Sequence, residues 1–199
     1  MTFSIVALCK KTSTLGVATA TANPYVGERV PHVEKGIGAI ATQGFTNVSY
    51  GIKGLELLKK GYSPREVLKV LLNEDPLYEY RQVLIIDFNG RIAAFTGRKT
   101  LGWKGHLVGN GYVMAGNILV SGNVIKEMAR TFEKFSEKPL PERLALALEA
   151  GAKAGGDKRG IVSAALVTSS LQNANLNFDI RVDFSKDPIR KLREMLRRT

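Results

Sequence analysis

The hydrophobic pattern opens with three apolar stretches that predict β-strands. Residues 2–9, 15–21 and 36–42 contain no charged side chain and are rich in Val, Ile, Ala and Thr. Because several positions in a row are apolar, rather than every second one, we expect both faces of their sheets to be covered. The segment between the last two, residues 22–35, lacks such a pattern and is expected to be irregular.

Two helices are predicted next. The first, residues 50–60, repeats apolar residues at helical spacing and ends at Gly61. The second begins at Ser63, because Ser63 with Pro64 and Glu66 matches the capping-box pattern of a helix start.

Strands and helices continue in alternating groups to the end of the chain. Asn89-Gly90 lies between two apolar runs and predicts a β-hairpin. The remaining predictions are strands over 82–87, 91–96, 112–115, 161–168 and 177–183, and helices over 123–135, 141–152 and from Asp187-Pro188 onward. This order excludes a regular β-α-β alternation and predicts the α+β class, with antiparallel sheets stacked between outer helices.

Composition narrows the class of protein. The chain has 199 residues, of which 44% are hydrophobic and 24% charged, as expected for one folded domain over residues 1–199. Its single cysteine, Cys9, excludes an intrachain disulfide. Cys9 with His32 and His106 is too few soft ligands for a zinc cluster, and no cofactor is expected.

The net charge of +11 is spread along the chain. There is no run of five like charges and no basic stripe interleaved with aromatic residues, so we expect a solvated cationic surface rather than nucleic-acid binding. No apolar run approaches the roughly 20 residues of a membrane span. The opening run, residues 5–9, is followed rather than preceded by Lys10 and Lys11, the reverse of a signal peptide, so a soluble cytoplasmic protein without membrane contact is expected.

Familiar motifs are missing or misplaced. Gly36 to Ala41 matches G-x-G-x-x-A, but the glycines lie within a strand pattern and not in a turn that opens a helix, as dinucleotide binding requires. The chain has no Walker A loop, no G-x-S-x-G elbow and no H-E-x-x-H pair.

Thr2 is a candidate nucleophile. A methionine before a small residue is commonly removed in cells, which would leave Thr2 with its hydroxyl and a free α-amine on one residue. The unperturbed pKa of an α-amine, about 7.7–8.0, leaves part of it neutral near pH 7. It can then act as the base for its own hydroxyl.

Several segments together resemble one family. They are Met1 to Ala7, Gly36 to Gln43, Asn47 with Tyr50-Gly51, Trp103 to His106, Gly116-Asn117, Ala154 to Gly160 and Arg181 to Asp183. In this order and spacing, over nearly the whole chain, they are similar to the domain of unknown function 1028 (DUF1028). That family is grouped with the N-terminal-nucleophile hydrolases, which include proteasome β subunits and aspartylglucosaminidase. The resemblance implies a four-layer αββα sandwich, an amide bond in a small or peptide-like substrate, and a homo-oligomer.

The resemblance also implies roles for residues. Thr2 matches the nucleophile, and Gly44 matches the position whose backbone N–H stabilises the oxyanion. In proteasome β subunits a lysine lowers the pKa of the nucleophile's amine. That lysine has no clear counterpart in this chain: Arg29 is nearest to its position by spacing, and Lys35 is the weaker candidate. Thr19 and Thr21 occupy the stretch where the proteasome-type acid would lie.

Five further polar residues are candidates for binding, although turns and ion pairs are the more frequent role of such residues: Asn47, His106, Asn117, Asp157 and Arg159. The alternative to catalysis is a binding protein on the same fold. It would hold an anionic metabolite near Arg29, His106 and Arg159.

Overall fold

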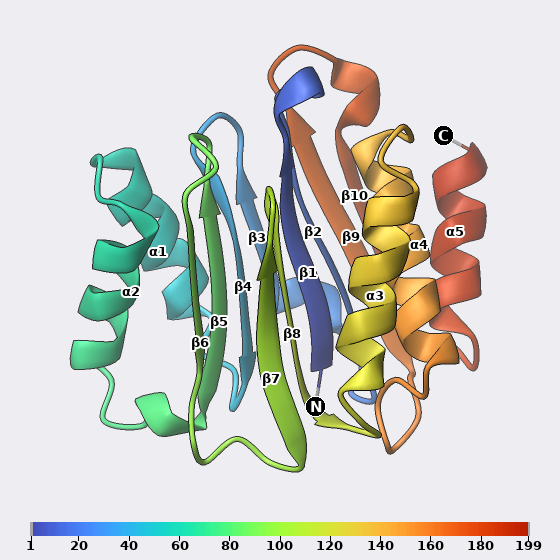
Figure 1. The fold of residues 1–199 in the computed structure, drawn as a ribbon, viewed down its shortest axis with the longest axis horizontal. Coiled ribbons are helices and arrows are strands. Elements are labelled where there is room, and N and C mark those ends of the chain that lie inside the picture. Colours follow the sequence, from blue (N-terminus) through green and yellow to red (C-terminus); the bar gives the residue numbers. More distant parts are fainter. Residues whose placement is uncertain (1, 199) are drawn as a thin grey trace.

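Residues 2–198, which the computed structural model describes, contain two antiparallel sheets (Figure 1). The larger sheet has the strand order β10-β9-β2-β1-β8-β7. Its strands are β1 (Thr2–Cys9), β2 (Thr14–Thr21), β7 (Trp103–Gly109), β8 (Tyr112–Leu119), β9 (Ser163–Ser170) and β10 (Phe178–Val182). Strand β1 therefore lies between β2 and β8, in the interior of the sheet.

The smaller sheet has the order β3-β4-β5-β6. Its strands are β3 (Pro31–Glu34), β4 (Gly38–Gly44), β5 (Arg81–Asp87) and β6 (Ile92–Thr96). The turn around Asn89-Gly90 joins β5 to β6 as an antiparallel hairpin, as the sequence predicts.

Helices cover the outer side of each sheet (Figure 1). Helices α1 (Ser49–Lys59) and α2 (Pro64–Asn73) lie against the smaller sheet, and the predicted capping box of Ser63 and Glu66 opens α2. Against the larger sheet lie α3 (Asn123–Lys134), α4 (Leu140–Lys153) and α5 (Pro188–Arg198). Short 3-10 turns occupy Lys10–Thr12, Val26–Glu28, Tyr78–Tyr80 and Ala174–Leu176. No helix within residues 2–198 is long and apolar enough to cross a bilayer.

Three apolar clusters hold these layers together. Phe3 and Ile5 pack with Met128 between the larger sheet and its helices. Val6 and Leu84 belong to a second cluster between the two sheets. A third, between the smaller sheet and its helices, contains Ile40, Val67 and Ile85.

Strand β1 shows how the two faces of the larger sheet are divided. Successive side chains of a strand point to opposite faces. Phe3 and Ile5 belong to the cluster under the helices, and Val6 belongs to the cluster between the sheets. Thr2 and Ser4 share the parity of Val6, so their side chains face the second sheet.

The prediction of an α+β protein with antiparallel sheets is confirmed. The sequence pattern did not predict two of the strands: β3, which lies in the segment expected to be irregular, and β7. Both are edge strands of their sheets, and no residue of β7 is fully buried. An edge strand buries fewer side chains, so its hydrophobic signal is weak.

Candidate functional site

The layer between the sheets changes from apolar to polar along β1. Toward Cys9 it contains apolar side chains such as Val6, Leu15 and Val17. Toward Thr2 it contains buried hydroxyls and amides, namely Thr2, Ser4, Thr19, Thr21, Gln43, Gln82 and Asn117. Polar groups are costly to bury unless each is hydrogen-bonded, so a polar end to a sheet interface marks a candidate site.

Thr2 and Ser4 anchor one side of this polar network. The Thr2 side chain is 5% exposed, and its Oγ1 lies 3.4 Å from Thr21 Oγ1. Ser4 Oγ lies 2.8 Å from Thr19 Oγ1 and 2.5 Å from Gln43 Oε1. Because an amide oxygen can only accept, the Ser4 hydroxyl donates to Gln43 and accepts from Thr19. Gln43 Nε2 donates to the Thr2 carbonyl oxygen at 3.3 Å.

Gln82 is the hub of the network. Its Oε1 accepts from Gln43 Nε2 at 2.6 Å and from Asn117 Nδ2 at 3.0 Å. Its Nε2 lies within 2.9–3.0 Å of three acceptors, Thr96 Oγ1 and the carbonyl oxygens of Gly105 and Gly116. Two amide hydrogens serve three acceptors, so one bond is shared. The orientation of this amide is therefore fixed.

His106 ends the network at the edge of the larger sheet. Its Nδ1 lies 2.9 Å from Thr96 Oγ1. The arrangement that satisfies both groups has Thr96 accepting from Gln82 and donating to Nδ1, so the ring proton is on Nε2. Partial burial of this edge-strand side chain lowers the pKa of His106, which favours the neutral ring.

The loop that contains Asp157 closes the end of β1. Asp157 forms a β-bridge with Leu119 at the end of β8. Its Oδ2 accepts the N–H of Ala22, just after β2, at 3.0 Å. Since β1 lies between β2 and β8, the Asp157 carboxylate is held at the strand end where Thr2 begins. Its side chain is fully buried and also accepts the Arg159 N–H at 2.8 Å.

A pocket of about 300 Å³ adjoins this end of the sheets. Asn117 lines the pocket and is the register partner of Thr2 on the neighbouring strand. The other lining residues come from five segments of the chain: Gly44, Phe45, Tyr80, Lys99, Thr100, Leu101, Ile118 and Arg159. The structure therefore brings four of the predicted site residues, Thr2, Gly44, Asn117 and Arg159, to one end of the molecule.

Gly44 directs its backbone N–H away from β5. Thr42 donates to Val30 O at 3.2 Å, on the side of β3. Alternate residues of a strand direct their N–H groups to the same side, so the N–H of Gly44 also points there, beyond the first residue of β3, Pro31. Its φ of 86° lies in the left-handed region that favours glycine. A side chain is also excluded by space, because a Cβ at this position would lie 2.6 Å from Tyr80 O.

The other predicted residues have separate positions. Exposed Arg29 donates from Nη2 to Pro24 O at 2.8 Å. Lys35 lies in the exposed turn between β3 and β4, at the opposite end of β4 from Gly44. Asn47 Oδ1 accepts the N–H of Ser49 at 3.1 Å, a turn at the start of α1. Within residues 2–198, neither cation contacts the Thr2 hydroxyl, and Met1, whose removal the hypothesis needs, lies outside the described residues.

Sequence reasoning did not single out Ser4, Gln43 and Gln82. The available signal was an uncharged amide near the end of an otherwise apolar strand, as in Thr42-Gln43-Gly44 and Arg81-Gln82-Val83. Such a residue is buried by its neighbours and needs a partner. Nothing in the sequence said that the two amides would meet. Among residues 2–198, no three His, Cys, Asp or Glu side chains are grouped to hold a metal ion.

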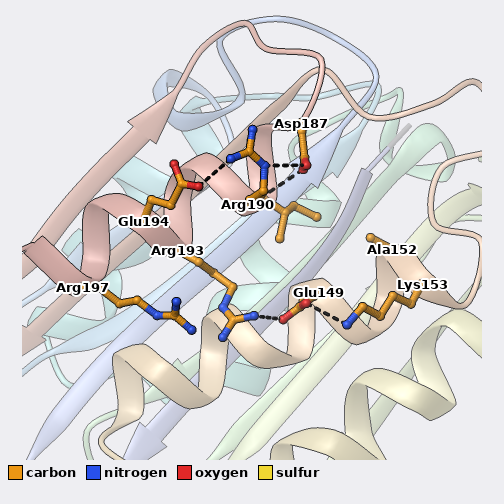
Figure 2. Close-up of a pocket in the computed structure, with 9 residues that line it drawn as sticks. Glu149, Ala152, Lys153, Asp187, Arg190, Arg193, Glu194 and Arg197 are labelled. Carbon is orange, nitrogen blue, oxygen red and sulfur yellow. Dashed lines mark hydrogen bonds and ion pairs between the residues drawn. The ribbon is translucent and has the colours of Figure 1, made fainter.

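A second surface feature, away from the network, is a groove of about 570 Å³ between α4 and α5 (Figure 2). Its charges largely pair with one another: Arg190 with Asp187 and Glu194, and Arg193 and Lys153 with Glu149. Surface pairs of this kind contribute little to stability. The polar end of the sheets remains the stronger candidate site.

A family model and two solved structures are similar to this chain. A family model described as "Family of unknown function (DUF1028)" matches residues 2–192. The crystal structure of protein SPO2555 from Silicibacter pomeroyi, titled with the same family model, has a TM-score of 0.91 and 29% identity, covering 99% of this chain and 85% of that one. Anbu (ancestral beta-subunit) from Yersinia bercovieri has a TM-score of 0.42 and 12% identity, covering 100% and 94%. No curated protein matches the sequence.

Proposed function

Because the chain belongs to the DUF1028 family, whose function is unknown, we propose its function from its site: hydrolysis of an amide bond in a small or peptide-like substrate, with Thr2 as nucleophile once Met1 is removed. One observation carries this proposal. Thr2 begins an interior strand and turns its hydroxyl into the polar end of the sheet interface, and its register partner on the next strand, Asn117, lines a pocket.

The fold is consistent with this reading. The sequence resemblance implies the four-layer αββα sandwich of N-terminal-nucleophile hydrolases. In that interpretation α1 with α2, the two sheets, and α3–α5 are the four layers (Figure 1). An interior strand that starts at the cleft between stacked sheets can present the first residue of a chain to a substrate.

The reaction would use the α-amine and hydroxyl of Thr2 at the start of β1, and the N–H of Gly44 at the end of β4. The neutral α-amine of trimmed Thr2 takes the hydroxyl proton while Oγ1 forms a bond to the amide carbon. The carbonyl π electrons move to oxygen, and the Gly44 N–H stabilises that oxyanion, a contribution of about 3 kcal/mol for one donor. The ammonium then protonates the leaving nitrogen as the C–N bond breaks. Water, deprotonated by the same amine, hydrolyses the resulting ester and frees Thr2.

Two side chains would position the nucleophile. Gln43 holds the Thr2 carbonyl oxygen from the second sheet, and its own amide is fixed by Ser4 and Gln82. Asp157 places a buried carboxylate at the end of β1, where the new α-ammonium would form. A carboxylate there would orient the amine and stabilise the α-ammonium once the hydroxyl proton has been taken up.

Binding of an anionic metabolite without turnover is the second candidate. One observation favours it: the groups contacting Thr2, the Thr21 hydroxyl and the Gln43 amide, are neutral, and no cation in residues 2–198 contacts the Thr2 hydroxyl. The same pocket, with Lys99 and Arg159 in its lining, would then be the binding site.

Covalent labelling tests the proposal directly. Protein from the native cell is examined by intact mass for loss of Met1, then treated with a β-lactone that acylates nucleophilic hydroxyls. We expect one adduct, mapped to the peptide that begins with Thr2. Thr2→Ala should abolish the adduct, Thr2→Ser should retain it, and protein that keeps Met1 should not react. Uniform retention of Met1, or an adduct that survives Thr2→Ala, would refute the nucleophile assignment.

A further inference from the structure

The geometry points to a substrate class for this pocket: a small amide that carries a free carboxylate and one apolar side chain, such as an N-acyl amino acid or a dipeptide. Lys99 and Arg159 would bind the carboxylate. The inference rests on the proposed function for the role of the amide, and on the pocket itself for the carboxylate and the apolar group.

The charge of the pocket favours an anion. Its lining includes Lys99 and Arg159 and no Asp or Glu. Lys99 Nζ lies 5.3 Å from the centroid of the Tyr80 ring and pairs with no carboxylate among residues 2–198. Arg159 Nη2 lies 3.5 Å from Asp157 Oδ2, but that carboxylate also accepts two backbone N–H groups. Even with Asp157 counted, the opening carries a positive charge.

The walls favour an apolar group beside that anion. Phe45 and Leu101 line the pocket and are 63% and 68% exposed. Large apolar side chains this exposed, gathered at one concave site, are typical of a surface that a ligand covers. The volume of about 300 Å³ is at the lower end for ligand pockets and suits one or two residues rather than a protein chain.

The backbone of the pocket is strained at Ile118. This β-branched residue has a φ of 48°, which is rare and unfavourable away from glycine. Its N–H donates to Leu101 O at 2.8 Å, and its carbonyl accepts the N–H of Lys158 at 3.3 Å. The strained residue thus fixes both the loop that carries Lys99 and Leu101 and the loop that carries Arg159. Strain of this kind is most often retained where it positions a binding site.

Paired probes test the carboxylate. N-acetyl-L-leucine ends in a carboxylate (the acid), and N-acetyl-L-leucinamide has a neutral carboxamide in its place (the amide). NMR titration of the full-length chain should show the acid binding at least tenfold more tightly than the amide, since charge-assisted hydrogen bonds are lost with the amide. Lys99→Gln and Arg159→Gln should each weaken binding of the acid severalfold and leave that of the amide unchanged.

Neighbouring cations supply matched controls. Arg98→Gln and Lys158→Gln remove the same charge from adjacent exposed positions that do not line the pocket. They should leave the preference for the acid intact. Equal binding of the two probes, or binding of neither, would overturn the substrate class. An equal loss in the control variants would show a long-range charge effect and would also overturn it.

The outcomes separate this inference from the proposed function. The titration needs neither turnover nor loss of Met1. If the acid is preferred but no β-lactone adduct forms on Thr2, the pocket binds carboxylates and the hydrolase assignment fails. If the adduct forms and the acid is not preferred, the nucleophile remains and the substrate class is wrong.

Discussion

Replacing Gln82 by glutamate tests whether the polar network is arranged as described. The substitution keeps the size of the side chain and exchanges the donor Nε2 for an oxygen. Gln82 is fully buried, and its Nε2 faces Thr96 Oγ1 and the carbonyl oxygens of Gly105 and Gly116. An ionised carboxylate only accepts hydrogen bonds, so all three acceptors would lose the bond that Nε2 donates to them.

The cost should therefore depend on pH. Burial and the facing carbonyl oxygens raise the pKa of the new carboxyl in the folded state above its unfolded value of about 4.3. The protonated form can still donate one hydrogen bond, so the variant is least destabilised below pH 4. As pH rises above 4.3, stability falls by about 1.4 kcal/mol per unit until the folded pKa is reached. When the pH is raised from 5 to 7, the free energy of unfolding of the variant should therefore fall by about 2–3 kcal/mol relative to that of wild type.

Urea unfolding followed by circular dichroism measures this loss. Wild type, Gln82→Glu and Gln172→Glu are compared at pH 5 and pH 7, because Gln172 is an exposed glutamine that makes the same change in charge. The control should stay within about 0.5 kcal/mol of wild type at both values. If Gln82→Glu behaves like the control, or if its destabilisation does not grow with pH, the network is not arranged as described.

Two further substitutions test the structure around the pocket. The Arg81 guanidinium holds the pKa of Asp75 at about 2, so the pair stabilises the fold above pH 4 and loses its effect as pH falls toward 2. Asp75→Asn leaves Arg81, 6% exposed, without its charge partner and should cost about 3 kcal/mol at pH 7, a difference that chemical denaturation should show shrinking in acid. Gly44→Ala should destabilise by about 1–2 kcal/mol more than Gly61→Ala: both have positive φ, but only at Gly44 would the Cβ lie 2.6 Å from a carbonyl oxygen. Equal melting temperatures of these two variants would contradict that difference.

Local signals predicted the interior strands and the helices well. Residues 2–9 carry an uninterrupted apolar pattern because β1 is covered on both faces. The capping box of Ser63 and Glu66 marks the start of α2. Strand β7 was missed because its side chains alternate between exposed and half-buried and include Gly105. The antiparallel order of strands follows from the hairpins, but which strands form which sheet does not.

The candidate site was likewise predictable only in part from the sequence. The sequence pointed to Thr2 because it follows Met1 and begins a predicted strand. The family resemblance added Gly44, and Asn117 and Arg159 were polar candidates within the resembling segments. The sequence could not join Gln43 to Gln82, 39 residues apart, nor place Asp157 beside Ala22, 135 residues away.

The apolar pattern of the chain determines which faces are buried, because burial follows from the type of each side chain and its period along the strand. The proposed function depends on which polar residues share a buried space, and that is decided by the stacking of one sheet on the other. The polar ends of β1, β4, β5 and β8 meet only because the two sheets stack. Hydrogen-bond partners so distant in sequence are set by tertiary structure alone.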